Sequence, residues 1–143
     1  MISGDGAGFL LLKRYEDAVR DGDHIYGCIL SSAMNGNGAR SGNPTAPSAE
    51  AEAEVVRRAW ETADLTSDDI TEIEAHGTGT IVGDPIEAES IQRCMTGNHR
   101  EHPLYVSALK SNVGHLGNIA GFAALVKVLT GFEHHVCYPI AGL

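Results

Sequence analysis

The sequence predicts an α/β fold whose parallel strands end at a shared edge. Two segments carry this prediction, because each joins a short apolar stretch to a polar cluster with a histidine and then to a helix. The first segment covers residues 70–95 and contains His76, and the second covers residues 104–132 and contains His115. Parallel strands place their carboxyl ends on one edge of a sheet, where α/β proteins build their sites. We therefore expect the two histidines to face each other.

The composition describes one ordinary globular domain of 143 residues. The chain is 43% hydrophobic and 20% charged, which leaves room for a core and argues against disorder. Its formal charge of −9 disfavours a nucleic-acid or anionic-membrane surface, since both need a basic face. No apolar run reaches membrane-spanning length, and no signal-peptide pattern opens the chain. We expect a cytoplasmic protein without nucleic-acid or membrane partners.

The three cysteines predict free thiols. Cys28, Cys94 and Cys137 are odd in number and widely spaced, which argues against a disulfide framework and a CxxC zinc site. Cys28 falls in a predicted strand and is expected to pack inside it. Cys94 falls near the end of a predicted helix, whereas a reactive thiolate prefers a helix N-terminus. That position speaks against Cys94 as a nucleophile.

The N-terminal part alternates turns with short elements. Gly4-Asp5-Gly6-Ala7-Gly8 precedes an apolar run at residues 9–12, which predicts a glycine turn and a buried strand. These glycines precede a strand and have the wrong spacing for a dinucleotide-binding loop. Residues 15–20 predict a helix that ends at Asp21-Gly22-Asp23, and residues 25–31 predict another strand.

A long loop and an amphipathic helix follow. Residues 34–47 are rich in Gly, Asn and Pro without periodicity, which predicts a loop, and long loops are often functional. Ser48 can cap the next helix, and the apolar stripe of that helix is expected to face the core. The stripe consists of Val55, Val56, Ala59, Trp60 and Ala63. Thr66-x-x-Asp69 indicates a capping box before the next strand.

The segment around His76 joins a strand end to a helix start. Residues 70–75 predict a short buried strand, so His76 lies at its tip. Asp84-Pro85-x-Glu87 predicts a helix start with Asp as N-cap and Pro at the first helical position. Between them lie three glycines and two threonines, which let backbone and hydroxyl groups approach a ligand. The loop suits an extended polar ligand beside an imidazole.

The second segment repeats this order after a helix at residues 86–95. The loop at residues 96–103 holds His99 and His102, which we expect to be solvated, because no partner ligands for a metal accompany them. Residues 104–109 predict a strand that leads to the cluster Lys110-Ser111-Asn112-Val113-Gly114-His115. The helix expected at residues 118–132 is apolar nearly all round, which predicts burial. No metal site is expected.

The two histidines indicate a functional site only when they are considered together. A single imidazole in such a place is more often a satisfied core or loop group. Two strand-end histidines, one with Lys110 and Asn112 nearby, suit polarising a carbonyl and handling a proton.

Four motifs resemble those of β-ketoacyl synthases, above all the ketosynthase domains of polyketide synthases and type I fatty acid synthases. The two histidine motifs are Glu74-Ala75-His76-Gly77-Thr78-Gly79-Thr80, with Gly83-Asp84-Pro85-Ile86-Glu87-Ala88, and Lys110-Ser111-Asn112-Val113-Gly114-His115. The glycine segment at residues 4–8 and the loop from Asn35 to Pro47 match in the same order. The resemblance covers nearly the whole chain.

The resemblance implies a thiolase-like fold of two α/β halves. Residues 1–143 would form a partial ketosynthase domain, with the end of the first half and most of the second. Ketosynthases join an acyl group on a cysteine to a malonyl-type extender on an acyl carrier protein by decarboxylative Claisen condensation. No cofactor would be bound directly, because the phosphopantetheine arm of the carrier brings the substrate. The whole protein is expected to be a homodimer.

Site roles follow from the same resemblance. His76 and His115 match the two catalytic histidines, whose neutral imidazoles would stabilise the enolate. Lys110 matches the active-site lysine, and Asn112 supports its loop. Thr78 and Thr80 match hydroxyls that meet the pantetheine arm.

One departure from the family is larger than the others. The family nucleophile lies on a Thr-Ala-Cys-Ser-Ser elbow, which is absent here, so this chain alone is expected to be inactive. Smaller departures are Asp5 and Gly117, where the family commonly has Glu. We expect a piece of a larger synthase that needs the remainder of the ketosynthase domain, and that dissolves poorly or oligomerises alone. A noncatalytic relic or a carrier-protein and pantetheine-binding module is the alternative.

Overall fold

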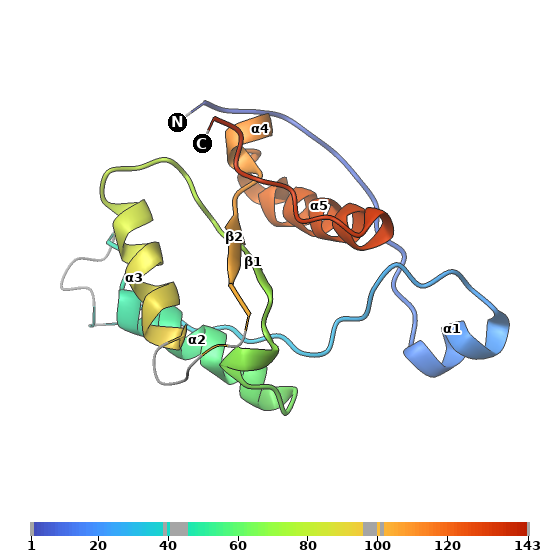
Figure 1. Ribbon diagram of the computed structural model, residues 1–143. Helices are drawn as coiled ribbons and strands as arrows, with labels where there is room; N and C mark the ends of the chain where they lie inside the picture. The colour runs from blue at the N-terminus through green and yellow to red at the C-terminus, as the bar shows by residue number, and fades with distance from the viewer. Residues whose placement is uncertain (1, 39, 41–45, 96–99, 101, 143) are drawn as a thin grey trace.

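The computed structural model describes residues 2–38, 40, 46–95, 100 and 102–142. Among these residues, helices flank a two-stranded sheet (Figure 1). Helices α2 (Ala49–Thr62) and α3 (Gly83–Met95) lie on one side of the strands, and α5 (Ala120–His134) lies on the other. Helix α1 (Tyr15–Asp21) stands apart from these layers. The α/β class predicted from the sequence is confirmed.

The strands β1 (Glu72–Glu74) and β2 (Tyr105–Ser107) run parallel. Their register pairs Glu72 with Tyr105 and Glu74 with Ser107. Past the ends of the strands the backbone contact continues, because the Ala75 amide donates to the Ser107 carbonyl at 2.7 Å. Both strands therefore end together, and the chain leaves each of them at the same edge. Both are shorter than the six-residue stretches that the sequence predicts.

The chain after β2 forms two short elements before α5. The single-turn helix α4 (Lys110–Val113) follows β2 closely, and the 3₁₀ helix η2 (Gly117–Ile119) leads into α5. His115 lies between them and pairs with the N-terminal segment, donating its amide to the Ile2 carbonyl at 2.8 Å. Its carbonyl accepts from the Gly4 amide at 3.1 Å. The start of the chain thus runs alongside His115 as a short parallel bridge.

Local sequence signals set several element ends. Helix α1 ends at Gly22, whose φ of 70° places it in the left-handed region that favours glycine. The Ser48 hydroxyl accepts from the Ala51 amide at 3.3 Å and caps α2. The 3₁₀ helix η1 (Ser67–Asp69) carries the reciprocal capping box of Thr66 and Asp69. These predictions are confirmed.

Two predicted strands do not form. Residues 9–12 and 25–31 are extended, but neither has a hydrogen-bonded strand beside it among the described residues. A strand needs a neighbour to satisfy its backbone groups, and here these apolar runs face outward. Phe9 is 100% exposed and Leu11 is 96% exposed. Cys28 is exposed as well, so the prediction that it packs inside a strand is wrong.

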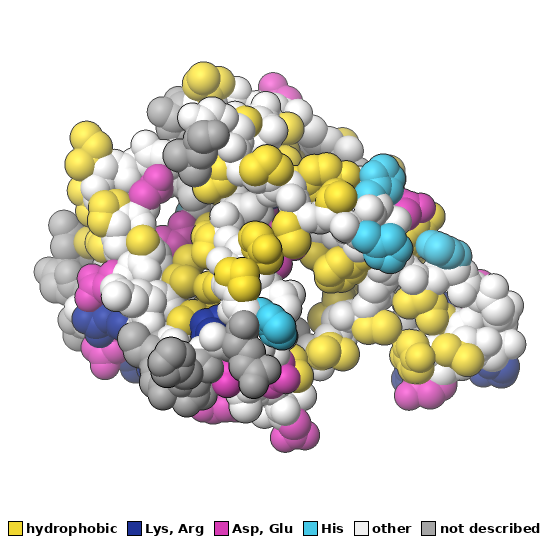
Figure 2. All heavy atoms as spheres, viewed as in Figure 1, with side chains coloured by type: hydrophobic (Ala, Val, Ile, Leu, Met, Phe, Trp, Pro, Cys, Tyr) yellow, Lys and Arg dark blue, Asp and Glu magenta, His cyan; other side chains and the backbone are white. Residues whose placement is uncertain are grey.

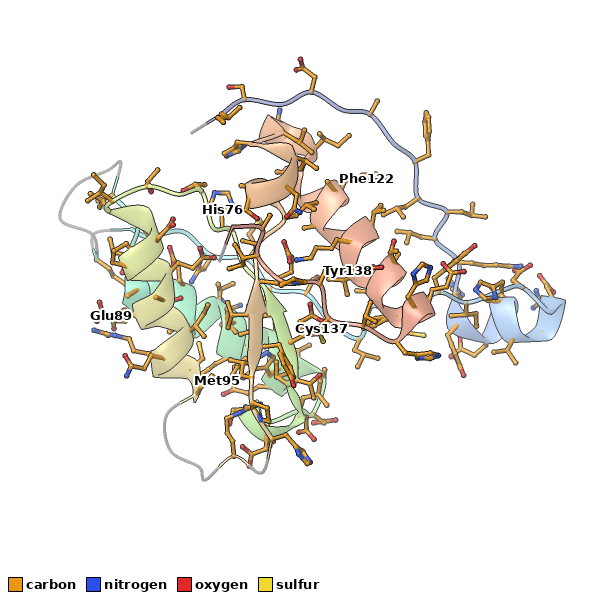
Figure 3. All side chains as sticks on the ribbon, turned by 45° about the horizontal axis from the view of Figure 1, so that its top comes forward. His76, Glu89, Met95, Phe122, Cys137 and Tyr138 are labelled. Atoms are coloured by element: carbon orange, nitrogen blue, oxygen red, sulfur yellow. The ribbon has the colours of Figure 1, made fainter. Side chains whose placement is uncertain are left out.

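The N-terminal segment does touch α5 at one close approach. A Cβ atom built on Gly8 would lie 2.2 Å from a ring carbon of Phe122, so only glycine fits there. Figure 3 shows Phe122 on α5 beside this segment. Much apolar surface remains open around it, and hydrophobic side chains gather on the face shown in Figure 2. The predicted burial of α5 is therefore only partial, with Val126 and Phe132 exposed.

The core consists of small side chains where α2 packs on α3. Among the described residues, no large side chain is fully buried, and the most buried apolar groups are Ala51, Ala53, Cys94 and Ala108. Alanines on α2 let the two helices approach closely. Trp60 and the rest of the predicted apolar stripe are only half-buried, so the stripe is a boundary rather than the centre of the core.

Glu52 is the polar exception in this helix pair. Its Oε2 atom is buried and has no hydrogen-bond partner. Burial raises the pKa of the Glu52 carboxyl, the Ser90 hydroxyl partly offsets this, and the charge of Glu87 adds to the increase. The folded chain therefore binds a proton at Glu52 more strongly than the unfolded chain does. Ionisation of Glu52 lowers stability as the pH rises above the ordinary carboxyl value of 4.5.

Replacing Glu52→Gln should stabilise the chain at neutral pH. The neutral amide removes the cost of an ionised, incompletely paired oxygen, so we expect the free energy of unfolding to rise by about 1 kcal/mol at pH 7. The gain should disappear near pH 4, where the glutamate is itself protonated. Urea unfolding at both pH values measures this.

Glu54→Gln provides the matched control for that comparison, since Glu54 is a partly exposed carboxylate on the same helix that pairs with Arg40. It should change stability by less than about 0.5 kcal/mol at either pH. A Glu52→Gln protein no more stable than the parent at pH 7 would contradict the inference that the ionised carboxylate of Glu52 lowers stability.

Candidate active site

The imidazoles of His76 and His115 meet edge to face. Their ring centroids lie 5.6 Å apart with an angle of 89° between the planes. His76 follows β1 and His115 follows α4, so the shared edge of the parallel strands brings them together. In Figure 3, His76 lies beyond the strand ends, between α3 and α4. The expectation that the two histidines face each other is confirmed.

A cavity of about 370 Å³ opens beside this pair. Its polar lining includes His115, Lys110 and Thr78, and its apolar wall includes Val106 and Ile91. The predicted residues His76, Thr80 and Asn112 do not line the cavity, although His76 is in ring contact with His115. The structure therefore brings together most of the predicted site and leaves Thr80 and Asn112 at its margin.

The carboxylate of Glu87 holds the loop that carries His76. It accepts from the His76 amide at 2.6 Å and from the Gly77 amide at 2.8 Å. Gly77 has a φ of 47°, and a Cβ atom there would lie 2.5 Å from the Cβ of Ala108. Only glycine fits both constraints. The sequence marked Glu87 as part of a helix start and missed this contact, because the acceptor acts on the preceding loop.

The Asp84 carboxylate, one turn earlier on α3, also accepts from an amide of this loop. The sequence predicts Asp84 as the N-cap, but α3 begins at Gly83. Thr80 precedes the helix and contacts its first residues: its hydroxyl accepts from the Gly83 amide at 3.1 Å, and its carbonyl accepts from the Asp84 amide at 3.2 Å. The Asp84 carboxylate turns back instead and accepts from the Gly79 amide at 3.1 Å. Two carboxylates of α3 thus fix the loop of residues 76–80.

The two threonine hydroxyls differ in their surroundings. Thr78 Oγ1 lies 3.3 Å from Thr80 Oγ1 and lines the cavity. Thr80 Oγ1 already serves as acceptor at the start of α3. Thr78 is therefore the better placed of the two for contact with a ligand.

The tautomer of neutral His115 follows from its backbone contact. The Gly117 amide donates to Nδ1 of His115 at 3.0 Å, so this nitrogen is an acceptor. A neutral imidazole with an accepting Nδ1 carries its proton on Nε2. His115 therefore offers Nε2–H as a hydrogen-bond donor.

His76 is held in its neutral form. Partial burial lowers the pKa of His76 most, and the nearby charges of Lys110 and His115 lower it further. Glu87 and Asp84 act in the opposite direction and do not reverse the shift. At neutral pH the ring of His76 is thus uncharged beside the positive charge of Lys110. This is the state expected of groups that hydrogen-bond a carbonyl oxygen.

The loop of Lys110 and Asn112 is tied through Ser111. The Ser111 hydroxyl lies 3.0 Å from the Ala108 carbonyl and 3.0 Å from Oδ1 of Asn112. It also accepts from the Ala141 amide at 3.0 Å, which brings the C-terminal segment to this loop. Asn112 is exposed and contacts the loop rather than the cavity. The supporting role of Asn112 stays a prediction.

None of the three cysteines lines the cavity. Cys94 is buried and directs its thiol to the Ala53 carbonyl at 3.5 Å, and burial raises its pKa. A hydrogen bond to Glu72 raises the pKa of Cys137. All three are free thiols, as predicted. The raised pKa values of Cys94 and Cys137 disfavour the thiolate form that a nucleophile needs.

Neither a cluster of metal ligands nor a membrane-spanning helix occurs in the described part of the chain. Within it, no three His, Cys, Asp or Glu side chains are grouped as a metal site would require. His102 is exposed, and His99 lies outside the described residues. Over the same described ranges, no helix is long and apolar enough to cross a membrane.

Solved structures of ketosynthase domains match the fold of this chain, which is therefore thiolase-like. The ketosynthase from module 6 of the bacillaene synthase of Bacillus subtilis matches with a TM-score of 0.83 and 36% identity, over 92% of this chain and 24% of that chain. Ketosynthase twelve of the bacillaene synthase of Bacillus amyloliquefaciens matches with a TM-score of 0.84 and 34% identity, over 90% of this chain and 23% of that chain.

The chain belongs to the β-ketoacyl synthase C-terminal domain family, which matches residues 26–143. Methylphloroacetophenone synthase of Cladonia uncialis is 47% identical over 93% of this chain and 5% of its own length. The non-reducing polyketide synthase stbA of Stachybotrys bisbyi is 44% identical over 96% of this chain and 6% of its own length. The chain thus spans about a twentieth of these relatives. The resemblance drawn from the motifs is confirmed, and its division between the two halves of the domain stays a prediction.

Replacing Lys110→Met should raise the pKa of His76 toward its ordinary value of 6.5, because one nearby positive charge is lost. NMR titration of the imidazole carbon-bound protons measures this directly. Lys13→Met is the control, since Lys13 pairs with Asp21 and Asp23 in the α1 region. An unchanged His76 titration in the Lys110→Met protein would show that Lys110 does not act on this ring.

Proposed function

We propose that the chain supplies the histidine half of a ketosynthase active centre in polyketide biosynthesis. The reaction is the decarboxylative Claisen condensation of a malonyl-type extender, carried by an acyl carrier protein, with an acyl-enzyme. The observation that carries the proposal is the facing pair of His76 and His115, with His115 and Lys110 lining the cavity beside the pair. Membership of the β-ketoacyl synthase family supports the reaction class.

The proposed chemistry begins at the malonyl thioester. The bond between the α-carbon and the carboxylate breaks, carbon dioxide leaves, and the electron pair becomes an enolate whose charge lies on the thioester oxygen. The enolate carbon then attacks the carbonyl of the acyl thioester, a carbon–carbon bond forms, and the cysteine thiolate leaves. The demanding feature is the negative oxygen, which fixed hydrogen-bond donors stabilise.

His115 and His76 are the proposed donors to that oxygen. The Gly117 amide occupies Nδ1 of His115, which leaves Nε2–H as the donor. The lowered pKa of His76 keeps this ring neutral, so it can donate one hydrogen bond without surrendering a proton early. Lys110 is proposed to maintain that state by its charge, and Asn112 to support the Lys110 loop through Ser111.

The cavity suits the thioester end of a pantetheine arm. Thr78 supplies a hydroxyl for its amides, and Val106 and Ile91 contribute apolar wall. Thr80 is proposed to act through Thr78, because its own hydroxyl accepts at the start of α3. The arm arrives as part of the substrate, and the proposal requires no cofactor bound by this chain.

The remaining parts are proposed to come from polypeptide outside this chain. The three cysteines have no place at the cavity, so the acylated cysteine belongs to the remainder of the ketosynthase domain. Exposed apolar residues on the extended segments, including Phe9, Leu11 and Leu30, support cover by that remainder. The acyl carrier protein and a second copy of the whole protein are the other proposed partners.

A second candidate follows from the same cysteine observation. A chain with a pantetheine cavity and no thiol beside it can act as a carrier-binding module without turnover. The two functions differ in one measurable step. Decarboxylation of a malonyl thioester needs the histidine pair, whereas binding alone does not.

Replacing His76→Ala in the full-length protein should reduce malonyl-thioester decarboxylation by about 100-fold, the usual cost of losing one donor to a developing oxyanion. His115→Ala should have an effect of similar size. Carbon dioxide release from malonyl-N-acetylcysteamine measures the rate, and His102→Ala is the control because His102 is exposed and away from the cavity. A parent protein with no activity, or His76→Ala with the parent rate, would favour the binding module.

A further inference from the structure

A buried ion pair lies beneath the two histidine loops and has no part in the site described above. Nζ of Lys127, on α5, lies 2.6 Å from Oε2 of Glu74, on β1. Each side chain is only 7% exposed. Lys127 is the only charged residue between Gly117 and Thr130, on a helix that the sequence marks as apolar. Such a lysine is buried only where a specific partner receives it.

The Glu74 carboxylate is fully engaged on both of its oxygens. Oε2 accepts from the Ser107 hydroxyl at 2.7 Å as well as from Lys127. Oε1 accepts from the Leu109 amide at 2.6 Å. Burial acts to raise the pKa of Glu74, but the bonds from Lys127, Ser107 and Leu109 outweigh it, and the pKa is lowered. The carboxylate therefore stays ionised.

These contacts end at the two loops that carry the site. Glu74 stands two residues before His76, and Leu109 stands directly before Lys110. One carboxylate thus fixes the exit of β1, the turn after β2 and the middle of α5. Any change in its position alters the distance between the His76 loop and the Lys110 to His115 loop.

A gain in stability does not by itself explain why this chain has a buried ion pair. Taking two charges out of water costs several kcal/mol, and replacing a buried ion pair by apolar side chains of similar volume is often neutral or stabilising. What an apolar pair cannot supply is an acceptor for the Leu109 amide and the Ser107 hydroxyl in one fixed place. Glu74 therefore differs from an apolar residue in its hydrogen bonds from Leu109 and Ser107, and these bonds set the position of the loop after β2.

We propose that Glu74 and Lys127 are positioning residues that set the spacing of the two histidine loops for the condensation chemistry. This inference rests on the proposed function for its catalytic consequence, and its geometric part stands separately. Neither side chain lines the cavity beside the two histidines, so both act through the loops they hold.

The test compares three variants of the full-length protein: Lys127→Met, Glu74→Leu, and the double variant Glu74→Leu with Lys127→Met, in which no side-chain acceptor for the Leu109 amide remains. The single variants leave a buried charge unpaired and lose stability. The double variant removes both charges at nearly constant volume, so its thermal stability should return close to that of the parent. The double variant is the informative one, because it shows the effect of loop position on activity without a loss of stability.

Two measurements report the relative position of the two histidine loops. The first is kcat for release of carbon dioxide from malonyl-N-acetylcysteamine, which should fall by about 100-fold in the double variant, with KM little changed, because a shift of about 1 Å in a catalytic group has this cost. The second is the pH dependence of acylation of His76 by diethyl pyrocarbonate, followed by mass spectrometry. The pKa of His76 should move toward its ordinary value as Lys110 and His115 move away.

Controls define the outcome. Glu54→Gln neutralises a partly exposed carboxylate and should leave both readouts unchanged, and His102 acts as the reference imidazole within each sample. A double variant that keeps either the parent kcat or the parent His76 titration overturns the proposal. If the parent itself releases no carbon dioxide, the proposed function fails, and the His76 titration alone then decides whether the ion pair sets the loops.

Discussion

The parallel pairing of β1 with β2 is the constraint on which the site depends. Its register sets Glu74 opposite Ser107, so both strands end at one level. From that level the chain needs only Ala75 to reach His76, and only two residues to reach Lys110. An antiparallel pair would place these groups at opposite ends of the sheet. The meeting of two loops that are distant in sequence is therefore a property of strand direction.

Carboxylates that accept from backbone amides hold both loops in place. Glu87 and Asp84 serve the loop of His76, and Glu74 serves the turn before Lys110. Each satisfies amides that a glycine-rich loop would otherwise leave to water. The negative charges of Glu87 and Asp84 favour protonation of His76, yet partial burial and the charge of Lys110 keep this ring neutral. The same scaffold thus fixes geometry and protonation state together.

Sequence reasoning succeeded where the causes are local. The Ser48 cap, the Thr66 and Asp69 box and the end of α1 at Gly22 each depend on neighbours within a few residues. It failed where the partner is distant. The apolar run at residues 9–12 has strand character but no strand beside it among the described residues. Lys127 gave only a weak signal, a single cation on an apolar helix, because its partner Glu74 lies 53 residues away. The histidines were found because their motif and strand-end position agreed.

The bridge between Ser3 and His115 has a consequence for how the site assembles. Both backbone groups of His115 are occupied by the N-terminal segment, through Ile2 and Gly4. That contact closes a very long loop of chain, and contacts of large sequence separation form slowly, because the chain entropy is lost before the contact is made. Helices α2 and α3 are closer in sequence, so we expect their packing to form before the contact between His115 and the N-terminal segment. During synthesis on the ribosome, the start of this chain must therefore wait for residue 115 to emerge before the two histidines can take their places.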